Sequence, residues 1–519
     1  MSAAPQLPSQ RFSQVLAAAA ESGPAALGPA ATSPLLGGSP IDPFVNSVVH
    51  DHRLVSPGSL FVARRGERFD AHEHLGAAVA AGAVAVVGEV PPGALPLGLG
   101  VPYAQVADGR LALPHLAAAL HRFPSRSLRV IGVTGTDGKT TTSYMLQHAL
   151  QADRPVGLIS TAAVKIGGTE QLLPGHFTTP EASDVQRLLA QIRDAGAVHA
   201  VLESSSHGFA LHRLDAVEYA VGVWTNLSPE HLDHHRTYAA YRDAKLELVR
   251  RAEASVLNLD DAEHAAFAAA SRGPVVSYGR APEAEFRLLD VRSLQDTVYL
   301  AISAHGEYLN ITLPMMGAYN AHNALAALAV AVHEGVPVES ACARLETFTG
   351  VPGRMQVVAG PSEKAPVRAP FTVVVDFAHT GPALEKALTA VKPEAPARLI
   401  LVVGAAGERD PGKRVPIANA ATALADLTVF TEEDSRSEPT ETILDELGRA
   451  AEAAGAQRSQ EFELIADRRE AIAAALSAAQ PGDVVLLAGK GHERTLERSS
   501  ETLAWDEAAE ARAALRSVL

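Results

Sequence analysis

The stretch that decides the fold in the middle of this chain is LRVIGVTGTDGKTTTSYML, residues 128–146. An apolar segment enters a glycine-rich turn, and helix-forming residues follow the turn directly. This order predicts a strand, a loop and a helix, the context in which the backbone N–H groups of a helix N-terminus hold phosphates. Lys139 is placed to reach the terminal phosphates of a nucleotide, and the Thr140 hydroxyl can bind Mg²⁺.

The spacing of this loop is unusual. The common phosphate loop has four residues between its first glycine and its Gly-Lys pair, whereas only two residues separate Gly135 from Gly138. A glycine-rich turn without a ligand is the alternative interpretation, and the strand-loop-helix context favours nucleotide binding over it. The predicted ATP-binding residues of the loop are Gly135, Thr136, Asp137, Gly138, Lys139, Thr140 and Thr141.

Two further apolar runs follow, and each one ends in polar residues. AVHAVL (197–202) leads to Glu203, and YAVGVW (219–224) leads to Thr225 and Asn226. Strands that alternate with helical segments predict a parallel sheet, whose ligands gather at the carboxyl ends of the strands. We therefore expect an α/β fold with a ligand site at these strand ends.

The length of 519 residues exceeds that of one ordinary domain. Strand-like SLFVARRG (59–66) and AVAVVGEV (83–90) predict a small α/β unit before the phosphate loop, and FTVVV (371–375) and LILVV (399–403) start a new alternation after it. We predict three domains, with the boundaries 1–125, 126–348 and 349–519.

The composition excludes several classes of protein. No uninterrupted apolar run has membrane-spanning length, so we expect no membrane insertion. The net charge of −15 argues against holding nucleic acid through a general basic field. Cys342 is the only cysteine, which excludes an intramolecular disulfide and fits a reducing compartment. The N-terminus lacks the basic and apolar segments of a secretory signal, and we expect a cytoplasmic protein.

The strand ends carry candidate metal ligands, and each has an ordinary alternative. Glu203 can act as a hard oxygen ligand for Mg²⁺, although a strand-terminal glutamate is as often a capping or surface group. The loop TNLSPEHLDHH (225–235) holds three histidines and two carboxylates, which fits either a transition-metal site or plain polar surface. Lys245 has the sequence surroundings of an exposed helical lysine.

Charged residues also follow the strands of the third predicted domain. VDFAH (375–379) and GKGHE (489–493) both close apolar strands. Between them, GERD (407–410) and EEDSR (432–436) form a mixed-charge set that suits a zwitterionic ligand, with Arg for a carboxylate and Glu or Asp for an ammonium group. Solvated surface charge is the alternative.

In this order along the chain, these segments resemble the Mur ligase family, and most closely its members that add the third residue of the cell-wall peptide. The likeness covers nearly the whole chain from about Ser47. The motifs that carry it are HDHRLVSPGSLFVARRG, GVTGTDGKTTT, TTPEASDVQ, LESSSHG, TNLSPEHLDHHRTYAAYRDAK, GAYNAHNALAA, GVPGRMQVV, VDFAHTGPALEKAL, GERDPGKR and AGKGHE.

The resemblance implies an α/β protein of three domains: an N-terminal domain for the UDP moiety, a central phosphate-loop ATPase with a parallel sheet, and a C-terminal Rossmann-like domain for the incoming amino acid. It implies an ATP-dependent ligase of peptidoglycan synthesis. Such an enzyme phosphorylates the terminal carboxylate of UDP-N-acetylmuramoyl-L-alanyl-D-glutamate and joins a free diamino acid to the resulting acyl phosphate. ATP and Mg²⁺ are the implied cofactors, and we expect a monomer that binds neither nucleic acid nor a membrane.

The resemblance also implies roles for individual residues. The catalytic residues would be Lys139, Glu203, His231 and Lys245. The metal ligands would be Thr140, Glu203, His231 and a carbamylated Lys245. The rest of the ATP site would consist of Asn320, Asn323, Arg354, Asp376 and His379. The UDP precursor would contact Asp51, His52, Thr178, Thr179, Ser205 and Arg213. The amino acid would face Arg409, Glu433, Asp434, Ser435, Arg436, Gly489 and Glu493.

Three positions depart from the family pattern. His52 stands where the N-terminal motif usually has Ser, and Leu211 stands where Gln often precedes the arginine that corresponds to Arg213. Members that select meso-diaminopimelate carry Asp-Asn-Pro-Arg where this chain has Glu-Asp-Ser-Arg, residues 433–436. The added carboxylate and the loss of the stiff Pro favour a ligand that ends in an ammonium group. We therefore expect L-lysine or L-ornithine, with meso-diaminopimelate as the alternative.

Two other functions are compatible with parts of the sequence. A folylpolyglutamate synthetase shares the ATPase and C-terminal domains, but the N-terminal PGSLFVARRG segment (57–66) argues against it. A nucleotide-regulated scaffold protein with an inactive loop is the second alternative. The intact set of predicted catalytic residues argues against that alternative.

Overall fold

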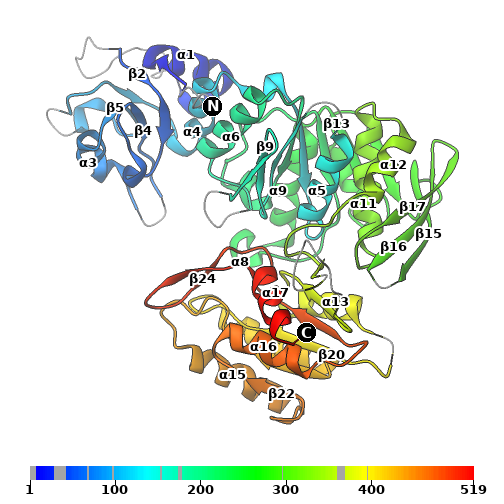
Figure 1. Ribbon diagram of the computed structural model, residues 1–519. Helices are drawn as coiled ribbons and strands as arrows, with labels where there is room; N and C mark the ends of the chain where they lie inside the picture. Colours follow the sequence, from blue (N-terminus) through cyan, green and yellow to red (C-terminus); the bar gives the residue numbers. More distant parts are fainter. Residues whose placement is uncertain are drawn as a thin grey trace. The chain divides into compact units, whose positions relative to one another are not determined.

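The computed structural model describes residues 8–28, 42–66, 69–95, 99–151, 155–173, 178–294, 296–358, 360, 369–393 and 395–518. Within these ranges the chain forms three sheets built mainly of parallel strands (Figure 1). It divides into two compact units, one of residues 1–286 and 325–341 and the other of residues 287–324 and 342–519. The domain boundaries proposed from the sequence, after residues 125 and 348, stay predictions.

The first sheet has four parallel strands in the order β3-β4-β5-β6. Alternate residues of a strand face opposite sides of a sheet, and Leu60 and Val62 accordingly pack with α1 and α4, while Phe61 packs on the side of α3. The strands predicted at 59–66 and 83–90 are thus confirmed. The bounds are β3 Ser47–Val49, β4 Ser59–Val62, β5 Ala83–Gly88, β6 Tyr103–Gln105, α1 Phe12–Ser22, α3 Leu75–Ala80 and α4 Gly109–Leu120.

The second sheet holds the phosphate loop. In the first compact unit its strands follow the order β10-β9-β8-β11-β7-β12-β13-β14, and all pairs from β8–β11 to β13–β14 are parallel. The bounds of the strands are β7 Arg129–Thr134, β8 Val156–Ile159, β9 Val164–Ile166, β10 Thr169–Gln171, β11 His199–Glu203, β12 Val221–Trp224, β13 Ala254–Asn258 and β14 Val275–Gly279. The helices of this unit include α5 Lys139–Leu150, α6 Ala182–Asp194, α7 Ser206–Ala210, α8 Leu232–His235, α9 Tyr238–Arg251 and α10 His264–Ala270.

The strand order places the predicted ligand residues side by side. β7 lies between β11 and β12, with Val133 opposite Glu203 and Thr134 opposite Trp224. The phosphate loop therefore begins level with the carboxyl ends of both neighbouring strands. This arrangement confirms that the polar residues that end these strands lie at one edge of a parallel sheet. That a ligand binds there stays a prediction.

An antiparallel hairpin and two helices follow in the chain. β16 pairs with β17 so that Val298 lies opposite Leu313. The bounds are β15 Phe286–Leu294, β16 Thr297–Ala304, β17 Glu307–Leu313, α11 Asn320–His333 and α12 Val338–Glu346.

The third sheet has six strands in the order β18-β19-β23-β20-β21-β22, all parallel to their neighbours except β18. Helices α13, α14 and α15 cover one face, and α16 and α17 cover the other. Helices on both faces of a parallel sheet make this a Rossmann-like arrangement. The bounds are β18 Gln356–Val357, β19 Thr372–Val375, β20 Leu399–Val403, β21 Leu427–Phe430, β22 Phe462–Leu464, β23 Val484–Leu487, α13 Gly381–Val391, α14 Arg414–Leu424, α15 Thr440–Ala453, α16 Arg468–Ala478 and α17 Glu507–Val518.

A small hairpin of β24 (Thr495–Glu497) and β25 (Thr502–Ala504) lies between β23 and α17 in the chain. None of the helices in the described part of the chain combines the length and the apolar character that crossing a bilayer requires.

Candidate active site

The phosphate loop leaves β7 and enters α5 through two glycines with positive φ. Gly135 has φ +149° and Gly138, the N-cap of α5, has φ +81°. Side chains other than glycine rarely adopt this backbone region. Lys139 begins α5, and its Nζ donates to the carbonyl oxygens of Gly135 at 3.1 Å and Thr136 at 2.7 Å. The lysine thus lies folded over the loop that is expected to hold the phosphates.

The residues that follow β12 hold this loop in place. The Thr225 hydroxyl donates to the carbonyl oxygen of Asp137 at 2.7 Å, and the Asn226 side chain bonds both the N–H and the carbonyl of Asp137. The backbone N–H of Thr136 donates to the carbonyl of Asn226. The sequence pattern placed Thr225 and Asn226 at a strand end but did not reveal that they support the loop.

Glu203 is buried at the end of β11 and faces the first turn of α5. Thr140 Oγ1 donates to its two carboxylate oxygens at 3.0 and 3.2 Å, and Ser160 Oγ and the Thr161 N–H donate to Oε2 at 2.7 and 3.0 Å. Glu203 is only 1% exposed, so the surface alternative from the sequence is wrong. A carboxylate beside a threonine hydroxyl supplies the hard oxygen atoms that Mg²⁺ prefers, so these residues fit that ion.

Lys245 lies inside the protein, and the sequence-based expectation of an exposed helical lysine is wrong. It is 2% exposed on α9, and its Nζ donates to the Gly135 carbonyl at 2.5 Å. Burial and the nearby Lys139 ammonium group lower the pKa of Lys245 well below its usual range. Both effects favour the neutral amine over the ammonium form at this position next to the phosphate loop.

Tertiary packing explains why local sequence gave the wrong result for Lys245. Helix α9 turns Tyr241 toward the loop, where its hydroxyl lies 3.0 Å from Thr136 Oγ1. Lys245 is one helical turn further along the same face. In the sequence, the only indication that Lys245 is buried was its spacing from Tyr241, which places both residues on one face of the helix.

His231 stands before the short helix α8 and is half-exposed. It has φ +54°, and its ring packs edge-on against His207 at a centroid distance of 4.7 Å. Its Nε2 lies 3.6 Å from a carboxylate oxygen of Glu230. The structure therefore groups His231 with the histidines of α7 and α8.

The residues expected at the UDP precursor form a connected set in the same compact unit. Thr179 Oγ1 lies 2.9 Å from Ser205 Oγ, and Arg213 donates to the Thr179 carbonyl at 2.8 Å. Glu181, which the sequence analysis missed, pairs with Arg213 at 2.7 Å. Thr178 lies next to Thr179 and is partly buried.

Asp51 and His52 lie just after the first strand of the N-terminal sheet. Asp51 Oδ1 accepts from the backbone N–H of Arg53 at 2.9 Å and its carboxylate pairs with the Arg53 side chain, which holds the pKa of the Asp51 carboxyl at about 2. The His52 ring stacks on His74 at 4.2 Å. The stacked ring offers a flat face beside a fixed carboxylate.

Three of the predicted ATP-site residues meet in the second compact unit. Asp376 accepts from the N–H groups of Met355 and Ala378 at 2.8 and 2.9 Å, and the Arg354 guanidinium lies over the Phe377 ring at 4.6 Å. His379 Nδ1 lies 3.0 Å from the Phe377 carbonyl. Asn320 and Asn323 sit on α11, where the Asn323 amide donates to Asn320 Oδ1 at 2.8 Å.

The residues expected at the amino acid form a second charged cluster in that unit. Lys490 is fully buried, and its Nζ donates to Asp434 at 2.7 Å and to Glu493 at 2.5 Å. Arg436 Nε donates to Glu497 at 2.9 Å. Lys490 and Glu497 were not among the predicted site residues, although Lys490 lies within the GKGHE motif.

The other predicted members of this cluster differ in burial. Glu433 is buried against Gly489, and its Oε2 has no hydrogen-bond partner among the described residues. Burial raises the pKa of the Glu433 carboxyl to about 7. Ser435 is buried, whereas Arg409 is exposed on the loop after β20.

Two family models match the chain, the Mur ligase middle domain over residues 133–331 and the Mur ligase, glutamate ligase domain over residues 353–491. The UDP-N-acetylmuramyl-tripeptide synthetase of Deinococcus radiodurans is 46% identical over 479 residues, which cover 91% of this chain and 95% of that protein. The chain belongs to the Mur ligase family. As a Mur ligase, the protein is an ATP-dependent ligase of peptidoglycan precursor synthesis.

Other relatives of this Mur ligase carry a different name. The UDP-N-acetylmuramoyl-L-alanyl-D-glutamate--2,6-diaminopimelate ligase of Alkaliphilus metalliredigens is 36% identical over 475 residues, covering 90% of this chain and 92% of that protein. A solved structure of an enzyme with the same name gives a TM-score of 0.62 at 28% identity and covers 93% of this chain and 97% of that chain. The names of the relatives thus leave the amino acid of this Mur ligase open.

Replacing Gly135 by Ala is expected to weaken nucleotide binding by this Mur ligase. The new Cβ would overlap the Thr225 hydroxyl oxygen, which is buried and holds the Asp137 carbonyl. We expect the dissociation constant for ADP, measured by calorimetry, to rise at least about tenfold, or roughly 1.4 kcal/mol.

Gly76→Ala is the matched control, because a Cβ at this position in α3 meets no heavy atom within 4 Å. Its affinity for ADP should equal that of the wild type. An unchanged ADP affinity in Gly135→Ala would contradict the account of the loop given above.

Proposed function

We propose that this Mur ligase adds a basic diamino acid, L-lysine or L-ornithine, to UDP-N-acetylmuramoyl-L-alanyl-D-glutamate in the cytoplasm. The choice of amino acid rests on one observation, the hydrogen-bonded ion pair between Arg436 and Glu497. The two named relatives are compatible with the tripeptide-forming reaction, and the sequence motifs of the N-terminal region favour the UDP-linked substrate over a folate.

The chemistry proceeds in two steps. The terminal carboxylate oxygen of the precursor attacks the γ-phosphorus of ATP, the bond between the β–γ bridging oxygen and that phosphorus breaks, and ADP leaves. The amine of the diamino acid then attacks the carbonyl carbon of the acyl phosphate, the C–O bond to phosphate breaks, and the nitrogen loses a proton as the amide forms. Lys139 is placed to offset charge on the transferred phosphoryl group, which is mainly electrostatic catalysis.

Thr140, Glu203 and His231 are the residues we propose for holding Mg²⁺, which would supply positive charge beside the phosphates. Thr140 and Glu203 already lie within hydrogen-bond distance of each other. The buried position of Glu203 keeps its oxygens aimed at the first turn of α5 rather than at solvent.

We also propose that Lys245 is carbamylated. Its neutral Nζ attacks the carbon of CO₂, an N–C bond forms, and one proton is released, so that a neutral amine is replaced by a carbamate with one negative charge. The Lys139 ammonium group, which shares the Gly135 carbonyl with Lys245, favours this reaction because it attracts the new negative charge.

The choice of amino acid rests on what Arg436 already contacts. Its Nε donates to Glu497, its Nη1 donates to the Gly407 carbonyl at 2.7 Å, and its backbone N–H donates to the Glu497 carbonyl at 3.0 Å. A distal carboxylate of meso-diaminopimelate would have to compete with Glu497 for this guanidinium. An amino acid that ends in an ammonium group meets no such competition.

The charges of the cluster favour the same class of ligand. Lys490 pairs with Asp434 and Glu493, and Arg436 pairs with Asp434 and Glu497. The Glu433 carboxyl is acted on by the charges of Lys490 and Arg468 but forms no ion pair among the described residues. The sequence argument rested on Asp434, which is paired with Lys490. Glu433, with a buried oxygen that lacks a hydrogen-bond partner among the described residues, is the carboxyl group we propose for the ligand ammonium.

The proposed function is tested by supplying ATP, Mg²⁺ and UDP-N-acetylmuramoyl-L-alanyl-D-glutamate and measuring phosphate release with lysine, ornithine and meso-diaminopimelate in parallel. We expect release with lysine or ornithine and little with diaminopimelate. Lys139→Ala should give no release, because it removes the lysine proposed to offset charge on the transferred phosphoryl group. Release with none of the three amino acids would refute the ligase proposal, and a preference for diaminopimelate would refute the choice of a basic amino acid.

Replacing Glu497 by Gln should shift the preference toward meso-diaminopimelate. The change removes the carboxylate that competes for Arg436 and keeps the side-chain size. We expect the ratio of kcat/KM for diaminopimelate to that for the better basic amino acid to rise about tenfold, which corresponds to roughly 1.4 kcal/mol.

Glu501→Gln is the matched control on the same hairpin, since Glu501 is exposed and pairs with Arg498 at 3.6 Å rather than with Arg436. It should leave the ratio unchanged. An equal ratio in the wild type and Glu497→Gln would mean that Glu497 does not exclude the distal carboxylate.

Replacing Lys245 by Ala should lower turnover at least about 100-fold, and added acetate should restore part of it by supplying the missing carboxylate. The measurement is phosphate release against acetate concentration. Lys139→Ala serves as the comparison, because acetate cannot replace an ammonium group there. A folded Lys245→Ala variant that acetate does not rescue would speak against the carbamate.

A further inference from the structure

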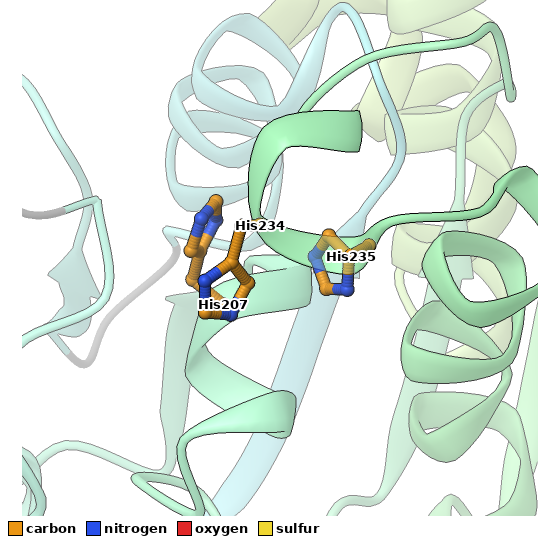
Figure 2. A group of neighbouring side chains, drawn as sticks. All are labelled: His207, His234 and His235. Atoms are coloured by element: carbon orange, nitrogen blue, oxygen red, sulfur yellow. The ribbon is translucent and has the colours of Figure 1, made fainter. Parts of the chain in front are cut away.

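Three histidines from two separate segments lie together beside the candidate active site. His207 belongs to α7, and His234 and His235 end α8 (Figure 2). One ligand-capable atom from each of the three side chains lies within 4.8 Å of the other two. The ring centroids of His207 lie 4.3 Å from His234 and 5.3 Å from His235. We call these residues the three-histidine cluster.

The fold holds the three rings to different degrees. His235 is buried, its Nε2 lies 3.1 Å from Ser206 Oγ, and its ring lies 5.4 Å from that of Tyr241. His207 is half-buried, and His234 is exposed. The cluster thus has a fixed inner ring and an outer ring that is open to solvent, which gives an ion a path of entry.

The backbone around α8 directs two consecutive histidines toward α7. His231 before the helix has φ +54°, and Arg236 after it has φ +64°. Non-glycine residues are uncommon in this region of backbone conformation. These two positions restrict α8 to a single turn, so that His234 and His235 both lie close to His207.

Imidazole nitrogens favour a different class of ion from the one expected at the phosphates. They suit Zn²⁺, Cu²⁺, Ni²⁺ and Co²⁺, whereas Mg²⁺ prefers oxygen ligands. In a tetrahedral zinc site each nitrogen lies roughly 2.0–2.1 Å from the ion, which places the nitrogens about 3.3 Å apart. The ligand atoms, which lie within 4.8 Å of one another, must therefore draw together by up to about 1.5 Å. The exposed His234 side chain can make most of that movement by a change of rotamer.

We propose that the three-histidine cluster binds one divalent transition-metal ion, with Zn²⁺ as its occupant, separately from the Mg²⁺ site proposed for Thr140, Glu203 and His231. Three protein ligands leave a fourth position for water. The ion would join α7 to α8. It would thereby link the chain segment that follows Ser205 with the one that follows His231. This inference does not depend on which amino acid the enzyme uses.

The test uses untagged full-length protein, because a histidine tag would bind the same ions. Equilibrium dialysis against ZnCl₂, with Mg²⁺ and ADP in excess, should give one tightly bound zinc per chain. Substitution by Co²⁺ should give the intense visible absorption of a tetrahedral cobalt site. Both signals should be lost when a ligand is removed.

Two variants remove a ligand, and one serves as the control. His234→Ala changes an exposed side chain, and His207→Gln keeps the size of a half-buried one. We expect the dissociation constant for Zn²⁺ to rise at least about tenfold in both, with unchanged circular dichroism and thermal midpoint in the absence of metal. His333→Ala, at the exposed end of α11, should bind zinc as the wild type does.

Three results would overturn the proposal. The first is a wild-type zinc affinity no greater than that of the ligand variants, and the second is retention of tight zinc binding in either His234→Ala or His207→Gln. The third is displacement of zinc by excess Mg²⁺ in the wild type, since that would mean that the two ions share a site. The zinc affinity and the cobalt absorption are measured without the ligase reaction. Failure of the proposed function and failure of the zinc site are therefore distinguishable.

Discussion

Two lysine amines share one backbone oxygen at the start of the phosphate loop. The carbonyl of Gly135 accepts from Lys139 at 3.1 Å and from Lys245 at 2.5 Å. Burial and the positive charge of Lys139 both disfavour a second ammonium group here, and they lower the pKa of Lys245. The site therefore needs negative charge, and the phosphates of a nucleotide supply it on one side. A carbamate on Lys245 would supply it on the other.

The rest of the central sheet serves this arrangement. β7 delivers the loop, β12 delivers the Thr225 and Asn226 side chains that fasten it, and β11 delivers Glu203 to the hydroxyl of Thr140. Helix α9 contacts the loop through Tyr241 and Thr136 and so brings Lys245 to the Gly135 carbonyl. Parallel strands with adjacent carboxyl ends are what allow residues far apart in sequence to meet at one point.

The sequence predicted those parts of the molecule whose signals are local. The strand-loop-helix order around Gly135 and the polar residues that end the strands at 203 and 225 could be recognised from neighbouring residues alone.

The burial of Lys245 was not predictable in this way, because its helix has an ordinary polar composition and only packing against the loop covers it. The partner of Arg436 was equally hidden, since Glu497 lies 61 positions further along the chain. The meeting of His207 with His234 likewise depends on how two short helices pack, which no spacing rule encodes.

The hairpin that carries Glu497 stands outside the six-stranded sheet in the hydrogen-bonding pattern. Leu496 of this hairpin is buried in the core beside the sheet, but a side chain such as Glu497 can be exchanged without removing a hydrogen bond from the ladder of β19, β23, β20 and β21. If Glu497 determines which amino acid binds, substitutions in this short hairpin could change the amino-acid substrate of the enzyme during evolution while the catalytic core stays constant. Substrate preference would then diverge faster than the fold, and relatives with similar overall identity would differ in the cell-wall peptide they build.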